Sequence, residues 1–394
     1  MIPQRPNIER RILTALDATP ARIPVLLGGC GSGRTSLLLR VAHVLGDGGT
    51  QYFDIERAAS TPEGFCASIT RESPYTVAPA SGNGHPVQAA PHDARSAVDS
   101  LLTFLQRAQS ADGRTPVFLI DESLELRTFE SFPGLRGIQR EVMQTLTTSP
   151  NRFVLTTRYT TRAHRLLRDA PERFEVLHIP PLSAAEVSAT LLTSEVGRDE
   201  AERNDLGRMI HVLTDGRPAY VRTITQALTS MDGASSGDPV SALASQLAVG
   251  APLSLLCRFS YELRLHRARG YAALKAILQV LADEEPLTLT EIAHRLGRTP
   301  GSTKDYLTWL QDVDLVSVRR KRYSFADPLL RLWVRLHCCP EPPDETDLSR
   351  EVQEYAVSRL PHMEPPASTG EDSEASHEGE TTKEDQGWSL IEID

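Results

Sequence analysis

Up to residue 182, short apolar runs alternate along the chain with segments that have a helical spacing of apolar positions. The runs are rich in β-branched and aromatic residues, which favours strands at 23–28, 51–55, 116–120, 152–156 and 174–179. Strands that alternate with helices predict a parallel sheet with helices on both faces. Residues 71–93 interrupt the pattern with Pro, Gly, Ser and Asn. This segment predicts a surface insertion, and a partner-binding loop is the alternative.

The strand signal stops after residue 182. Residues 183–231 predict three helices, and a break rich in Gly and Ser follows at 232–239. From 251 to 340 the pattern predicts a helix, a short helix that ends at Gly297, another helix and a β-hairpin at 315–325. This is the element order of a winged-helix domain.

The net charge of −10 comes from the C-terminal end of the chain. Residues 341–394 hold 16 acidic and 3 basic residues, so this segment carries −13 and residues 1–340 carry +3. The segment is also rich in Ser, Thr, Pro and Gly, which predicts a disordered acidic tail. Large apolar residues gather at its end: Trp388, Leu390, Ile391 and Ile393.

Length and composition narrow the class of protein further. A chain of 394 residues suits two or three domains, and 40% hydrophobic residues are enough for sizeable cores. The sequence has no run of 18 apolar residues, so no membrane span is expected, and the first six residues lack an apolar signal region. The five cysteines form no Cys-x-x-Cys pair, so neither a zinc site nor a disulfide framework is expected. The sequence therefore predicts a cytoplasmic protein.

A glycine-rich loop between the first strand and a helix carries the strongest chemical signal. Residues 28–35 have the Gly-x4-Gly-Lys-Ser/Thr spacing of a phosphate-binding P-loop. The glycines let backbone N–H groups approach phosphate oxygens, and the helix start favours an anion. The residues expected to bind the nucleotide here are Gly28, Gly29, Cys30, Gly31, Ser32, Gly33, Arg34, Thr35 and Ser36.

Arg34 stands where the motif has lysine. It can neutralise the β- and γ-phosphates, but it is longer and planar where lysine is a compact point charge. The loop therefore predicts nucleotide binding, and it leaves two alternatives open, turnover or binding without turnover.

Two further predicted strands end in polar side chains. The strand at 116–120 is followed by Asp121 and Glu122. Asp121 is expected to hold Mg²⁺ together with Thr35, and Glu122 is expected to act as general base toward the attacking water. The next strand ends in Thr157 and Arg158, which are expected to sense the γ-phosphate. An ordinary strand end is the alternative for this last pair.

A Gly-Arg-Pro sequence at 216–218 lies between two predicted helices. Gly216 can adopt a positive φ, and Pro218 favours the start of the next helix. As part of a lid, the segment would touch the adenine or, through Arg217, the phosphates. A plain helical turn is the alternative.

These motifs together resemble the AAA+/STAND group of P-loop ATPases, in particular the archaeal-type ATPases with a C-terminal winged helix. The resemblance rests on 28–35, 121–122, 157–158 and 216–218, with flanking similarity at 5–10 and 323–335. It implies an α/β P-loop NTPase core with a five-stranded parallel sheet and helices on both faces, a helical lid and a C-terminal winged-helix domain. The expected boundaries are 1–182 for the core, 183–235 for the lid, 236–340 for the winged helix and 341–394 for the tail.

The resemblance also implies ATP or ADP with Mg²⁺ as ligands, a lid contact from Pro218 and a homo-oligomer in the ATP-bound state. It further implies an arginine finger before the fifth strand that completes a neighbour's site. Arg173 holds that position in this sequence. Arg162, Arg165 and Arg168 compete with it, and a structural surface arginine is the alternative.

Two classes of function follow. The first is an ATP-driven switch with a DNA-associated output, in which duplex DNA is contacted by the basic hairpin tip, Arg319, Arg320, Lys321 and Arg322. The second is an ATP-dependent assembly scaffold with slow or no hydrolysis, in which the winged helix is structural and Trp388, Leu390, Ile391 and Ile393 dock a protein partner. The tail has two other interpretations, a mask over the basic domain or a solubilising segment. A degenerate fold that binds no nucleotide is a third alternative.

Overall fold

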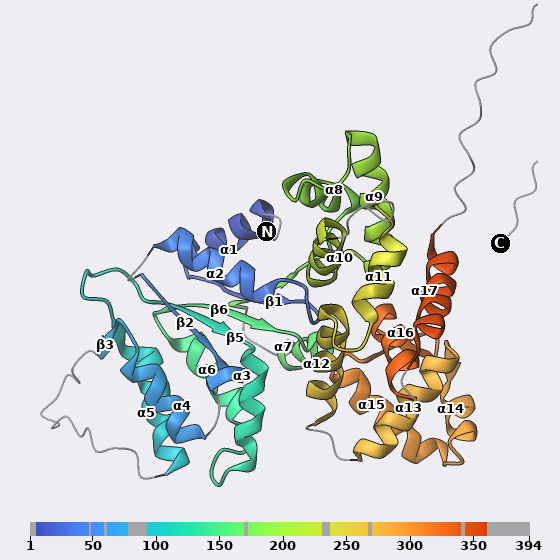
Figure 1. Cartoon of the computed structure of the whole chain (residues 1–394). Helices are drawn as coiled ribbons and strands as arrows, with labels where there is room; N and C mark the ends of the chain where they lie inside the picture. The colour runs from blue at the N-terminus through green and yellow to red at the C-terminus, as the bar shows by residue number, and fades with distance from the viewer. Residues whose placement is uncertain are drawn as a thin grey trace, which may run out of the picture. The chain divides into compact units, whose positions relative to one another are not determined.

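A five-stranded parallel sheet lies at the centre of the N-terminal half of the chain (Figure 1). Its strands follow the spatial order β2-β5-β6-β1-β7, and every pairing between neighbours is parallel. They are β1 (Ile23–Leu27), β2 (Thr50–Asp54), β5 (Val117–Asp121), β6 (Arg152–Thr157) and β7 (Phe174–His178). The five predicted strands are thus confirmed. Every position of β1 and of β5 is buried, as expected of strands covered on both faces.

The structure is a computed structural model, and it describes residues 5–46, 49–58, 61–77, 93–168, 172–230, 237–266, 270–339 and 343–360. These residues all belong to one unit, Met1–Leu360. The apolar end of the predicted tail lies outside the described residues, as does most of the predicted insertion.

The sheet's pleat sends alternate side chains to two separate cores. On one face Leu26, Leu119 and Val154 pack beneath α1 (Pro6–Asp17) and α2 (Arg34–Leu45). On the other face Phe118 and Phe153 stack with ring centroids 5.5 Å apart. The elements on that face are α4 (Pro62–Arg71), α5 (Ala94–Arg107), the 3-10 helix η1 (Ser123–Ser131) and α6 (Ile138–Thr148).

The strand register brings the predicted motifs to one edge of the sheet. Leu27 pairs with Thr157, so the P-loop leaves β1 beside the end of β6. Asp54 pairs with Asp121 at the end of β5. Short elements flank this edge and the opposite one: α3 (Ile55–Ala58), α7 (Thr160–Leu167) and the two-stranded pair β3 (Thr76–Val77) and β4 (Ala108–Gln109).

Three helices follow the sheet, as predicted: α8 (Ala184–Thr193), α9 (Glu200–Thr214) and α10 (Pro218–Ser230). Gly216 joins the last two at a φ of +61°. A Cβ atom added there would lie 2.2 Å from the carbonyl oxygen of Leu182. Only glycine fits this junction, because any other residue would be strained at this positive φ and its side chain would clash with the carbonyl oxygen.

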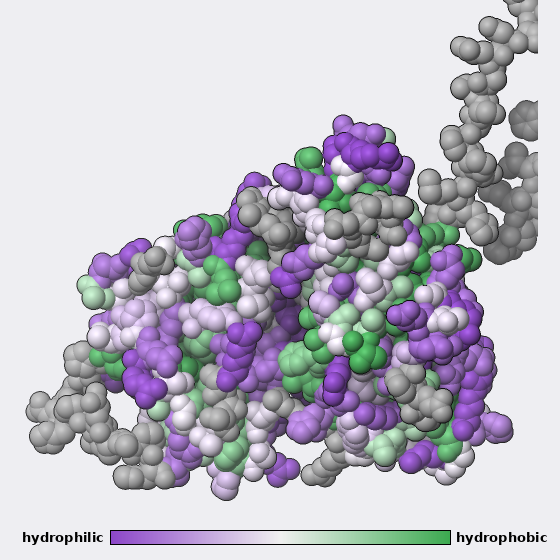
Figure 2. All heavy atoms as spheres, in the orientation of Figure 1, coloured by the Kyte–Doolittle hydropathy of each residue, from purple (hydrophilic) through white to green (hydrophobic). Residues whose placement is uncertain are grey.

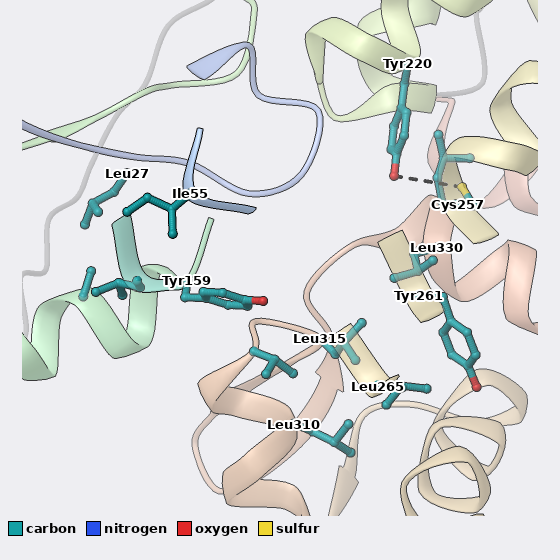
Figure 3. Close-up of a cluster of buried hydrophobic side chains, with 14 of the residues drawn as sticks. Leu27, Ile55, Tyr159, Tyr220, Cys257, Tyr261, Leu265, Leu310, Leu315 and Leu330 are labelled. Carbon is teal, nitrogen blue, oxygen red and sulfur yellow. Dashed lines mark hydrogen bonds between the residues drawn. The ribbon is translucent and has the colours of Figure 1, made fainter. Parts of the chain in front are cut away.

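The C-terminal elements have the predicted order of helices and hairpin. They are α11 (Pro239–Leu247), α12 (Pro252–His266), α13 (Tyr271–Asp283), β8 (Leu287–Thr288), α14 (Leu289–Arg295), α15 (Pro300–Asp312), β9 (Val316–Arg319), β10 (Arg322–Phe325) and α16 (Pro328–His337). The short strand β8 was not predicted, and it completes a three-stranded sheet of order β8-β10-β9. Figure 3 shows how α10 and α12 meet, where the Cys257 thiol donates to the Tyr220 hydroxyl oxygen at 4.0 Å.

A final helix, α17 (Glu345–Arg359), corrects one sequence prediction. Leu348, Val352 and Ala356 recur every fourth residue and are buried, and the helix packs on α9, α11 and α16. The prediction of a disordered tail from residue 341 is therefore wrong for 345–359. The prediction followed the acidic composition and overlooked a single apolar stripe, which is enough to hold a helix against a larger core.

Within the described residues, no single helix is long and apolar enough to cross a membrane. Helices α11 and α12 meet that criterion only as a pair, bent by 55° at their junction. Apolar surface is visible over α12 in Figure 2, and the exposed large apolar residues of this helix are Leu255 and Phe259.

Candidate functional site

The predicted P-loop connects β1 to α2 and lies under the start of α10. Gly31 and Gly33 have φ values of +76° and +86°, a region that favours glycine. The backbone N–H of Ala219 donates to the carbonyl oxygen of Gly31 at 3.1 Å. A Cβ added at Gly31 would lie 2.9 Å from that of Ala219. The loop therefore contacts α10 closely, and its residues are half-buried apart from the buried Arg34 and the exposed Ser36.

Arg34 links the P-loop to the second motif. Its Nη1 donates to the carbonyl oxygen of Gly28 and, at 2.6 Å, to that of Gly29. Its Nη2 donates to Oε1 of Glu122 at 2.5 Å. The Arg34 side chain is 8% exposed and that of Glu122 is 5% exposed. The guanidinium therefore uses its fork to fill the loop and to hold the predicted general base at the same time.

Arg158 holds Glu122 from the other side. Its backbone N–H donates to Oε2 of Glu122 at 3.2 Å, and its Nη2 lies 3.1 Å from Oε1. Burial alone would raise the pKa of Glu122, but the charges of Arg34 and Arg158 and their hydrogen bonds lower it below the ordinary value. Glu122 is therefore ionised and fully engaged, and a carboxylate in this state is a weak base toward water.

The carboxylate of Asp121 accepts hydrogen bonds from hydroxyl groups rather than from arginines. Thr35 Oγ1 donates to its Oδ2 at 2.6 Å, Tyr52 donates to the same oxygen at 3.2 Å, and Thr156 donates to Oδ1. Burial, followed by the charge of Asp121, raises the pKa of Tyr52. Hydroxyl and carboxylate oxygens are the ligands Mg²⁺ prefers, and it needs few of them from a protein when phosphates supply the rest. Thr35 and Asp121 fit that ion.

Two acidic residues at this site were missed by sequence reasoning. Glu56, on α3 just after β2, accepts a hydrogen bond from Arg158 Nη2. Asp327 lies 3.4 Å from Arg217 Nη1. Arg217 also reaches the P-loop, since a Cβ atom added to Gly29 would lie 3.2 Å from the same nitrogen. Glu56 carried a usable signal, since it follows the end of a strand at the same sheet edge. Asp327 carried only a local signal, that of a helix cap before α16.

The buried Arg264 of α12 was also missed. Its Nη1 donates to the carbonyl oxygen of Asp314 at 2.8 Å, and its Nη2 donates to Ser260 Oγ at 2.8 Å. Burial would raise the pKa of Cys30 in the P-loop, but the charges of Arg264, Arg158 and Arg34 lower it to about 7. No sequence signal marks Arg264, because one arginine on an apolar helix has no local distinction.

Arg173 does not contact this chain's own site, and its predicted role in completing a neighbour's site stays a prediction. It precedes β7 at the amino edge of the sheet, where its guanidinium donates to the carbonyl oxygens of Ala21, Leu146, Thr147 and Ser149. These contacts favour the structural alternative for Arg173. Among its competitors, Arg165 pairs with Asp312 at 2.5 Å.

The other predicted residues do come together. The P-loop, Asp121, Glu122, Arg158 and the Arg217-Pro218 segment lie within one network of hydrogen bonds and close contacts. Their roles toward a nucleotide stay predictions.

Comparison with known proteins identifies the fold. No family model and no curated protein matches this sequence. A solved Walker-type ATPase of Pyrococcus abyssi does match, with a TM-score of 0.59 at 17% identity over 84% of this chain and 95% of that chain. This chain has the fold of a P-loop ATPase.

Other solved structures align less well. Orc1 of Aeropyrum pernix, solved in complex with DNA, has a TM-score of 0.44 at 15% identity over 90% of this chain and 93% of that chain. RuvB of Thermotoga maritima has a TM-score of 0.42 at 14% identity over 82% of this chain and 92% of that chain. Similarities this low carry no argument about this chain. Its chemistry has to be argued from its own residues.

Proposed function

We propose that this protein is an ATP-binding molecular switch of the AAA+/STAND type, in which hydrolysis is held back while Arg34 binds Glu122, and whose output is associated with DNA. The observation that carries the proposal is the buried contact between the P-loop arginine and the residue in the position of the general base, 2.5 Å from Nη2 to Oε1. It connects the phosphate-binding loop directly to the hydrolytic step.

The residues divide the work in the following way. The P-loop backbone N–H groups and Arg34 bind the phosphates, and Thr35 and Asp121 hold Mg²⁺. The ion, when bound, neutralises charge on the phosphate oxygens. Pro218 starts α10 over the loop, so the lid covers the nucleotide from that side.

Release of Glu122 is the regulated step. A phosphate oxyanion offers the guanidinium of Arg34 a partner that competes with the carboxylate of Glu122. Once Arg34 turns to the phosphate, Glu122 keeps only its contacts with Arg158, and one of its oxygens becomes available to accept a proton from water. Hydrolysis is slow under this scheme, because it waits for this rearrangement.

The C-terminal elements support a DNA-associated output. The order α13, β8, α14, α15, β9, β10 is that of a winged helix. Arg320 and Lys321 form the two-residue turn of the wing at φ values of +50° and +64°. Residues other than glycine adopt this left-handed backbone region at a cost of about 1–2 kcal/mol per residue, and turns of this kind usually contain Asn or Gly. Two exposed basic residues kept in strained backbone support a functional tip, and phosphate contact is the chemistry that fits them.

The second candidate is an assembly scaffold with little or no hydrolysis. It is favoured by the contacts of α15, whose last residue, Asp312, pairs with Arg165 of α7. Asp314, just beyond, accepts hydrogen bonds from the backbone of Thr160 and from Thr161. These contacts hold one end of the helix against the core, as a structural winged helix requires. Partner docking through the chain end at 388–393, oligomerisation with ATP and a cytoplasmic location stay predictions.

The test compares ATP binding and ATP turnover of the full-length protein with and without duplex DNA, beside Glu122→Gln. Turnover that rises with DNA and disappears in Glu122→Gln supports the switch with a DNA-associated output. Tight ATP binding without turnover in either condition supports the scaffold. Absence of ATP and ADP binding contradicts both.

A further inference from the structure

A cavity of about 340 Å³ lies beside the nucleotide site, among residues that the proposed switch does not use. Its walls come from η1, α7, α12 and α15, with Tyr159 just before α7. Figure 3 shows the buried Tyr159 directed toward the elements that carry Leu310 and Leu315. The volume is within the range of pockets that bind small molecules.

The cavity has an excess of positive charge. Arg127, Arg162 and Arg264 line it, and Glu125 is its one lining carboxylate among the described residues. Neither Arg127 nor Arg162 forms a hydrogen bond or ion pair with any residue that the structure describes. Burial, followed by the charge of Arg127, lowers the pKa of Arg162. The two guanidinium groups therefore repel each other, and a bound anion would remove that repulsion.

The remaining walls suit an organic ligand. The guanidinium of Arg162 lies over the ring of Tyr159, 5.2 Å from its centroid, and Trp309 presents a second aromatic surface. The hydroxyl groups of Thr128 and Ser131 add hydrogen-bonding partners. Arginines that present forked donors bind phosphate oxygens in pairs, and aromatic walls favour a flat ring next to them.

We infer that this cavity is a second ligand site, which binds a small phosphate ester that carries an aromatic or heterocyclic ring. Arg127 and Arg162 bind the phosphate, and Tyr159 and Trp309 contact the ring. The site is separate from the P-loop, because none of residues 28–35 lines it.

A ligand here would contact both the ATPase core and the C-terminal elements. Tyr159 follows Arg158, which holds Glu122, and Arg264 donates to the Asp314 carbonyl beyond α15. The ligand would therefore stabilise the arrangement in which α7 and α15 are in contact.

The test uses phenyl phosphate as the probe and tryptophan fluorescence as the readout. It is made on the full-length protein with Trp388→Phe, which leaves Trp309 in the cavity and the buried Trp333. We expect a saturable change in emission that disappears in Trp309→Phe. Arg162→Gln should weaken binding at least tenfold, and Arg127→Gln, on an exposed residue, should do the same if Arg162→Gln does not fold.

The controls separate this site from other anion sites. Arg34→Gln changes the P-loop, and Arg198→Gln removes an arginine from a distant surface; both should leave the affinity for phenyl phosphate unchanged. Loss of binding in Arg34→Gln with full binding in Arg162→Gln would place the anion at the P-loop and overturn the inference, as would no saturable signal at millimolar probe. The assay contains no nucleotide, so its outcome does not depend on the proposed ATP switch.

Discussion

Arg34→Lys is the substitution that most directly tests the restraint on hydrolysis. It keeps the positive charge and restores the usual residue of the motif, but it replaces a fork of donors by a single ammonium group. In the structure one arm of the fork, Nη1, fills the P-loop and the other arm, Nη2, reaches Glu122 at 2.5 Å. An ammonium that fills the loop leaves the Glu122 contact unmade.

The size of the effect follows from the lost contact. A hydrogen bond between charged groups contributes about 1.5–3 kcal/mol. Its loss should raise the population of released Glu122 by about 10- to 150-fold, since about 1.4 kcal/mol corresponds to a factor of ten. Because Arg158 still holds Glu122 at 3.1 Å, the gain should lie nearer the lower end of this range.

The assay is steady-state ATP turnover by the full-length protein. We expect kcat to rise in Arg34→Lys, and we expect the gain to vanish when Glu122→Gln is added. Arg40→Lys is the matched control, because Arg40 lies on the same helix and pairs with Glu9 at 2.6 Å, away from the site. A folded Arg34→Lys protein whose kcat equals or falls below the wild-type value would refute the reasoning, since Glu122 would then not be restrained by Arg34.

Three other predictions test separate parts of the structure. Alkylation of Cys30, followed by mass spectrometry of its peptide, should be half-maximal near pH 7 because the arginines favour the thiolate, and ATP should slow it; the pH dependence of an ordinary thiol would contradict this. Asp314→Ala removes the cap of α7 and should lower the free energy of unfolding by about 1–2 kcal/mol in urea, whereas Asp312→Ala, which breaks a pair with an exposed arginine, should cost less. Replacing Arg320 and Lys321 by glycine relieves the strained turn, so stability should not fall, but the slope of log affinity against log salt for duplex DNA should shrink by about 1.8; an unchanged slope excludes phosphate contacts by these two residues.

The sequence predicted what depends on local pattern. The strands were readable because each is an apolar run bounded by turns, and the meeting of Asp121, Glu122 and Arg158 followed from the rule that parallel strands end at one edge. The partners of these residues were not readable in the same way. That Arg34 would bind Glu122 depends on the reach of one side chain across 88 positions of sequence.

The features that sequence reasoning missed have separate physical causes. Arg264 and Asp327 reach the site through the packing of α12 and α16 against α10, and no local period reports that packing. Helix α17 was missed for a different reason, because a stripe of small and medium apolar residues was outweighed by the acidic residues between them. The role of Arg173 as an arginine finger stays a prediction, because such a residue would act in the site of a neighbouring copy; in this chain main-chain carbonyl oxygens accept its hydrogen bonds.

The charges around the P-loop point to how nucleotide binding would reach the C-terminal elements. Four arginines lie there, Arg34, Arg158, Arg217 and Arg264, and three carboxylates pair with members of this group, those of Glu56, Glu122 and Asp327. The phosphates of ATP would compete with these carboxylates for the arginines.

The contact that yields first should be the longest one, the 3.4 Å pair of Arg217 with Asp327, because the pairs of Arg34 and Arg158 with Glu122 are shorter. Asp327 caps α16, so its release from Arg217 would be felt at the start of that helix. We therefore expect ATP to change amide hydrogen exchange at the start of α16 before it changes exchange in β6. The experiment uses the Glu122→Gln protein, in which ATP is not hydrolysed and therefore persists. Exchange that changes in β6 alone would show that the nucleotide acts through Arg158 and leaves the C-terminal elements in place.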